Sequence, residues 1–209
     1  MGFEEGARSR LRRYRGEADR SMQLMREAEE AAGRFSERLF AGLEYVAALG
    51  REAGFEVEAA RGVGGTLSLR VAAGPEARAE ATFGLVEGAA AETHEDLMHE
   101  ELSSYVLEPS GYSGRILGFS EQVGEEPCQV FAVYADGVWR TRGVFVEKAR
   151  GRLDDPDEVI NGFCLRIFGR LIDLAAPTGG SGRSWAEGPY ALADLLDRIG
   201  FPIRTRWFR

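Results

Sequence analysis

The chain has 209 residues and a formal net charge of −8, with 44% hydrophobic and 29% charged residues. This composition is that of a globular protein with one domain, or with one domain and an extension. It excludes a membrane span, since no apolar run approaches ~20 residues, and the acidic balance argues against nucleic-acid binding by the surface as a whole.

The expected compartment is the cytoplasm, because the N-terminus carries no apolar signal segment. The two cysteines, Cys128 and Cys164, fall in an expected strand and an expected buried helix and form no CxxC pair. We interpret them as reduced core thiols, with a disulfide between them as the less favoured alternative.

Residues 11–53 place small or apolar residues at heptad spacing, which predicts a long N-terminal helix packed lengthwise on another helix. Gly16 and Gly33 are candidate breaks, because a glycine in a helix interior costs ~1 kcal/mol. We expect residues 34–53 to lie on the protein's own sheet and residues 8–32 to form a dimerisation helix. One seam position holds Leu11, Ala18, Met25, Ala32, Leu39, Val46 and Ala53, and the other holds Tyr14, Ser21, Ala28, Phe35, Gly42 and Leu49.

The start of this helix is strongly basic although the protein is acidic. Its arginines form an arm suited to an acidic surface of another subunit or to a phosphate backbone. Leu11, Tyr14 and Met25 are seam residues in the same stretch, and we predict that they contact the partner together with the arm. The arm consists of Arg8, Arg10, Arg12, Arg13 and Arg15.

Three segments of alternating apolar and polar residues follow the helix, which Gly54 is expected to end. They cover residues 55–59, 67–71 and 79–85 and predict an antiparallel meander with one wet face. The glycine-rich stretch 62–66 lies between two of them. We interpret it as a hairpin turn, because a phosphate-binding loop would lead into a helix.

A second helix is expected from Thr93, where Asp96 completes a capping box. Loops at 109–114 and 121–127 flank a short strand at 116–119. The two histidines, His94 and His99, lie on this helix at a spacing of five residues, which does not place them on one face as a zinc site requires. We therefore predict no metal site.

Residues 129–135 and 138–146 read as two strands joined by Asp136-Gly137, the sequence typical of a two-residue type I′ turn. A two-residue loop places Tyr134 opposite Trp139 on one face of the hairpin. Arg140 and Arg142 then lie together on the other face. Neither face is plainly polar, so we expect both to be at least partly covered.

A third helix begins in the stretch 154–158, which supplies aspartates for the cap, a proline for the first turn and acids for the positive end of the dipole. It is apolar around most of its circumference, and Phe163, Ile167 and Leu171 are expected in the core. Pro177 ends this helix. A glycine-rich linker at 178–184 and a last helix at 190–199 precede a basic aromatic tail of Arg204, Arg206, Trp207, Phe208 and Arg209.

Taken together, the pattern predicts an α+β protein with an antiparallel sheet of about five to six strands packed by helices and a long N-terminal helix. Residues 1–53 form that helix, 54–176 the α+β core domain, and 177–209 the linker, C-terminal helix and tail. No catalytic motif or cofactor-binding motif is present, so we expect no cofactor and favour a non-enzymatic interaction module. It would be a homo-oligomer or a subunit of a larger complex, with the basic arm, the seam residues and the tail as contacts.

Two alternatives remain open. The face around Arg140 and Arg142, with Tyr134 and Trp139 stacking from the hairpin, could hold an anionic ligand as a sensor or enzyme. The competing interpretation is that the arginine stems simply lie across an apolar sheet with their heads in water. The second alternative is nucleic-acid binding through the arginine-rich termini, which is not favoured because those termini suit an acidic protein surface equally well.

Overall fold

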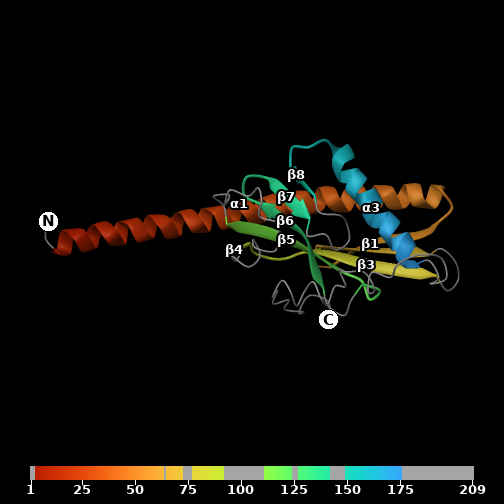
Figure 1. Ribbon diagram of the computed structural model, residues 1–209, viewed down its shortest axis with the longest axis horizontal. Coiled ribbons are helices and arrows are strands. Elements are labelled where there is room, and N and C mark those ends of the chain that lie inside the picture. Colours follow the sequence, from red (N-terminus) through yellow and green to blue (C-terminus); the bar gives the residue numbers. More distant parts are fainter. Residues whose placement is uncertain are drawn as a thin grey trace.

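The fold is taken from a computed structural model that describes residues 3–63, 65–72, 77–91, 111–123, 127–141 and 149–175. A long helix runs into a curled antiparallel sheet, and a second helix lies across both (Figure 1). The elements are α1 (Phe3–Glu52), β1 (Glu56–Gly62), β2 (Thr66–Ala72), β3 (Arg78–Leu85), β4 (Ala90–Ala91), β5 (Tyr112–Phe119), β6 (Cys128–Tyr134), β7 (Val138–Thr141), β8 (Arg150–Arg152) and α3 (Asp157–Ala175).

Helix α1 is continuous over 50 residues, so neither Gly16 nor Gly33 interrupts it. It ends where the sequence predicts. Gly54 takes a positive φ of 93°, its amide donates to the carbonyl of Arg51, and the amide of Phe55 donates to the carbonyl of Gly50, each at 3.0 Å. These two bonds are the pattern of a Schellman cap, which needs a residue that tolerates left-handed backbone.

The predicted α+β class with an antiparallel sheet and a long N-terminal helix is confirmed. Among the described residues the sheet has eight strands in the order β1-β2-β3-β5-β6-β7-β8, with β4 paired to β5 beside this path. The sheet therefore exceeds the expected five to six strands. The additional strands β4 and β8 have two and three residues, too few to show an alternating pattern in the sequence.

The two helices pack on the same face of the sheet. Helix α1 contacts β1, β5 and β6, helix α3 contacts β2 and β3, and the helices contact each other. Their inward side chains join those of the strands in one apolar core. Phe163, Ile167 and Leu171 of α3 are buried in it, as predicted.

Glycines allow the closest approaches in this core. A Cβ on Gly42 would stand 2.7 Å from the Sγ of Cys164, and a Cβ on Gly50 would stand 2.5 Å from the ring of Phe168. A Cβ on Gly114 would stand 2.3 Å from that of Ala32. Strand β5 begins at Tyr112, so the prediction of residues 112–114 as loop is wrong. Gly114 is needed for the close contact between β5 and α1, and not for a turn.

Two arginines connect α1 to neighbouring elements through hydrogen bonds and ion pairs. Arg38 donates to the carboxylate of Asp157 at the start of α3, to the carbonyl of Asp155 at 2.8 Å, and to the carbonyl of Leu153. Arg61 of β1 makes a bidentate contact with Glu44, at 2.7 and 3.0 Å, which lowers the pKa of that carboxyl. The second half of α1 is thus an integral part of the globular body.

Candidate interaction surface

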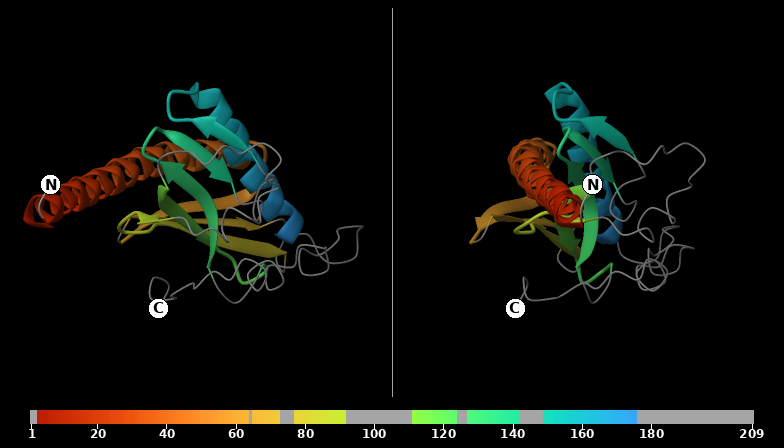
Figure 2. Two further views of the ribbon diagram at one scale, coloured as in Figure 1. Left: turned by 60° about the vertical axis from the view of Figure 1, so that its left-hand side comes forward. Right: turned by 90° about the vertical axis from the view of Figure 1, so that its left-hand side faces the viewer.

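The first half of α1 projects from the body. Figure 1 and the left view of Figure 2 show it extending beyond the sheet and α3. Every residue from Arg8 to Arg20 is exposed, whereas buried positions begin at Ala28. We call residues 3–27 the projecting segment. The prediction that residues 34–53 lie on the protein's own sheet is confirmed. The predicted boundary at residue 32 is wrong, because Ala28, Ala31 and Ala32 are already buried against the body.

Large apolar side chains lie on the projecting segment in contact with solvent. The exposed fraction is 66% for Leu11, 53% for Tyr14, 51% for Met22 and 36% for Met25. With Ala18 they are spaced three or four residues apart, so they share one side of the helix. We call these five residues the apolar stripe.

The apolar stripe continues without a break into the core-facing side of α1. The same spacing leads from Met25 to Ala28, Ala32, Phe35 and Leu39, which are buried against the sheet and α3. The helix therefore carries one apolar side, covered by its own sheet along the second half and uncovered along the first. Sequence reasoning missed Met22 because a strict heptad omits it, while the 3.6-residue helical period includes it.

The basic arm lies along the same segment, and its arginines are exposed. Arg8 pairs with Glu4 at 3.8 Å and Arg13 with Glu17 at 3.4 Å, both within the helix and open to water, where such pairs contribute little. Arg10 and Arg15 have no ion-pair partner among the described residues. The tail residues 204–209 lie outside those residues, as do the predicted helices at 93–106 and 190–199.

The β6–β7 hairpin has a longer loop than the sequence predicts. Trp139 lies opposite Val133 and Arg140 opposite Ala132, so the loop has three residues instead of two. The amide of Gly137 donates to the carbonyl of Tyr134 at 2.9 Å, and Gly137 takes a φ of 81°. This is the three-residue hairpin in which a turn is followed by a left-handed glycine.

The extra loop residue exchanges the two faces of β7. The prediction that Tyr134 and Trp139 share a face, with Arg140 on the other, is wrong, because a one-residue shift turns each side chain of β7 to the other side. Trp139 is fully buried in the core, with its ring centroid 4.9 Å from that of Phe163.

Arg140 and Tyr134 lie together on the outer face. The guanidinium carbon of Arg140 is 5.1 Å from the centroid of the Tyr134 ring, and Arg140 is only 5% exposed. The register places Arg115, Arg140 and Arg150 in one row across β5, β7 and β8. Arg142, the fourth predicted ligand residue, lies outside the described part of the chain.

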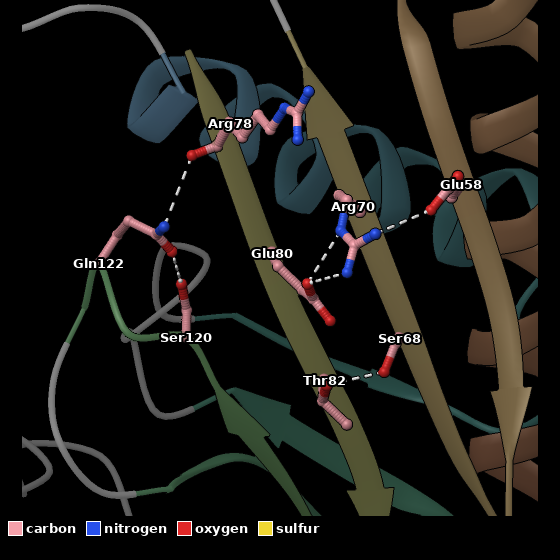
Figure 3. Close-up of polar contacts among 8 residues, drawn as sticks. All are labelled: Glu58, Ser68, Arg70, Arg78, Glu80, Thr82, Ser120 and Gln122. Atoms are coloured by element: carbon pink, nitrogen blue, oxygen red, sulfur yellow. Dashed lines mark hydrogen bonds and ion pairs between the residues drawn. The ribbon is translucent and has the colours of Figure 1, made fainter. Parts of the chain in front are cut away.

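The outer face of the meander is wet, as predicted, and carries a ladder of polar pairs (Figure 3). Arg70 of β2 lies between Glu58 of β1 and Glu80 of β3, at 3.1 and 2.7 Å. Beside it the hydroxyls of Ser68 and Thr82 are 2.8 Å apart. These are cross-strand pairs that satisfy one another and support the sheet, so we assign this face a structural role.

Metal and membrane chemistry find no support within the described residues. They contain no group of three or more His, Cys, Asp or Glu side chains that could hold a metal ion, and no helix among them is long and apolar enough to cross a membrane. Both histidines fall in the stretch 92–110, which lies outside the described residues. No protein-family model matches the chain, and neither a curated protein nor a solved structure is detectably similar to it.

Proposed function

We propose that this protein is a non-enzymatic interaction module, a homo-oligomer or a subunit of a larger assembly, that docks through the projecting segment of α1. The observation that carries the proposal is the apolar stripe, which leaves its own sheet at Met25 and continues in solvent to Leu11. Helices gain most of their stability from packing an amphipathic face. A partner lying along the stripe supplies that packing.

The stripe favours a protein partner over a nucleic acid. Fully burying one leucine or methionine side chain contributes roughly 1.5–3 kcal/mol, and a phosphate backbone offers no comparable apolar surface. The arginines beside the stripe then act as a polar rim, which steers association and disfavours wrong partners.

The proposal is tested on the full chain by disrupting the stripe. The variant carries Leu11→Gln with Tyr14→Gln, and the matched control carries Arg20→Gln on the polar side of the same segment. Light scattering coupled to gel filtration should find wild type and control well above the monomer mass of 22.9 kDa and the variant at it. Circular dichroism should show that all three remain folded.

The opposite result is equally clear. A wild-type chain that stays at the monomer mass at high concentration, with no partner co-purifying, overturns the proposal. So does a stripe variant that assembles as well as the control.

A second candidate function is supported by the arginine row on the outer face. The register places three arginines in one row, and the guanidinium group is a side chain suited to binding an anionic ligand. It ranks below the first because Arg140 is nearly buried and Trp139 belongs to the core. Calorimetric binding of inorganic phosphate that Arg140→Gln abolishes and Arg70→Gln preserves would support it.

A further inference from the structure

We infer that the partner is a second copy of this chain, bound antiparallel along the projecting segment with the two-fold axis at Ala18. The inference rests on the proposed function and specifies both the occupant of the apolar stripe and its direction. Two features of the segment carry it: the symmetry of the stripe about Ala18 and the distribution of charge along the helix.

The stripe is symmetric about its middle. Leu11 and Met25 lie seven residues on either side of Ala18, and Tyr14 and Met22 lie four residues on either side. An antiparallel pair centred on Ala18 therefore stacks Leu11 on the partner's Met25 and Tyr14 on the partner's Met22. The small Ala18 side chains meet at the axis, where they let the helices approach to the ~8–10 Å of close helix packing.

The charges decide the direction. Residues 6–19 hold five arginines, Glu17 and Asp19, and therefore carry a net charge of +3. Residues 17–30 hold five acidic and two basic side chains and carry −3. The antiparallel pair places each of these ranges opposite the other. A parallel pair sets the five arginines against five arginines, and like charges side by side are destabilising.

The antiparallel arrangement also satisfies both copies at once. A two-fold axis makes the contact isologous, so the basic arm of each chain meets the acidic end of its partner's segment and neither surface is left over. In this register Arg15 stands opposite Ser21, and Arg10 stands opposite Arg26 with Glu27 one residue farther along the partner helix.

Single cysteines report the direction of the pair. Cys128 and Cys164 are buried, and burial raises the pKa of each thiol to about 12, so neither competes for a crosslinker at neutral pH. Ala18→Cys alone should crosslink to itself under oxidation, because the two copies meet at the axis. Leu11→Cys alone should not, but a mixture of Leu11→Cys chains with Met25→Cys chains should.

Salt provides a second measurement that needs no variant. Opposite charges across the antiparallel pair attract, so raising the ionic strength from 50 to 500 mM should weaken dimerisation by about tenfold as the Debye length shortens to a few ångströms. A parallel pair would become tighter, because salt would screen the repulsion between the arginines.

Each outcome has a distinct meaning. Dimers with self-crosslinking at Leu11→Cys, or with tighter association in salt, overturn the antiparallel inference and leave the proposed function standing. A monomer that binds a different protein through the stripe does the same. A monomer with no partner overturns both. Crosslinking at Ala18→Cys that persists in the Leu11→Gln, Tyr14→Gln background would mean random collision and also counts against the inference.

Discussion

At the scale of single residues, burial makes the two core thiols harder to deprotonate. The Sγ of Cys164 lies 3.5 Å from the carbonyl of Leu39 between the two helices, and the Sγ of Cys128 lies 3.5 Å from the carbonyl of Gly118. Both cysteines are free, which agrees with the prediction of reduced core thiols. Desolvation opposes the charged thiolate and raises each pKa from 9.0 to about 12.

These raised pKa values predict a loss of stability at alkaline pH. In the folded state the thiols keep their protons above pH 9, while in the unfolded chain they release them, so the unfolded state binds fewer protons and stability falls as pH rises. The slope approaches about 1.4 kcal/mol per pH unit for each thiol. Urea denaturation at pH 8, 9 and 10 measures it. The Cys128→Ala, Cys164→Ala double variant, although less stable at pH 8, should lose this part of the slope; an unchanged slope contradicts the prediction.

The hairpin shows what single residues disclose and what they leave open. Asp136-Gly137 predicts a turn at the right place, because Gly137 does take a positive φ. The same dipeptide fits a two-residue loop and a three-residue loop, and the two differ by one residue of register. The choice is made by packing: with Trp139 inward, its ring meets Phe35, Phe131 and Phe163. A two-residue sequence signal carries no information about a tertiary contact. The prediction therefore placed Trp139, and not Arg140, on the same face as Tyr134.

At the scale of elements, the glycines of α1 play opposite roles. Gly33 faces open space, where an added Cβ meets nothing within 4 Å, whereas Gly42 touches α3. Sequence alone assigns both the same helix penalty of ~1 kcal/mol. At Gly42 the close packing of α1 against α3 offsets that penalty. At Gly33 no contact offsets it.

A matched pair of alanine variants tests this difference. Gly33→Ala should stabilise the protein by about 0.5–1 kcal/mol, because alanine is the better helix former and nothing obstructs its methyl group. Gly42→Ala should destabilise it by about 1–3 kcal/mol, because the Cβ would overlap Cys164 and force the helices apart. Chemical denaturation monitored by circular dichroism gives both values. Changes of the same sign would show that the α1–α3 crossing is not as close as described.

Element prediction succeeds where the pattern is long and fails where it is short. The helix α1, the meander β1–β3 and the helix α3 show sustained periodicity, and all three are found close to the expected bounds. The strand β8 has only three residues and lies shortly before the start of α3, and its Gly151 is required because a Cβ would stand 2.3 Å from the Trp139 ring. Such a contact depends on a residue far from the local window.

At the scale of the whole molecule, α1 divides the protein into a body and an extension that share one helix. The body contains every buried core residue described, starting with Ala28, while the extension contains only exposed or partly exposed positions. The sequence shows the heptad pattern but cannot indicate where the sheet ends. A seam covered by the chain's own strands has the same spacing as a seam covered by a partner. The exposed fraction of each seam residue separates the two cases.

This division predicts that the extension can be removed without unfolding the body. A chain beginning at residue 27 keeps Ala28, Ala32 and Phe35 and should melt at the same temperature as dilute full-length protein, within about 2 °C. Full-length protein should melt at a temperature that rises with concentration, because association stabilises the folded state by mass action. The shortened chain should show no such rise.

A chain beginning at residue 37 serves as the control: it lacks the Phe35 ring, which lies 5.0 Å from Phe131, and should not fold. If the chain beginning at residue 27 also fails to fold, the first half of α1 is needed by the body itself, and the apolar stripe is part of the protein's own core.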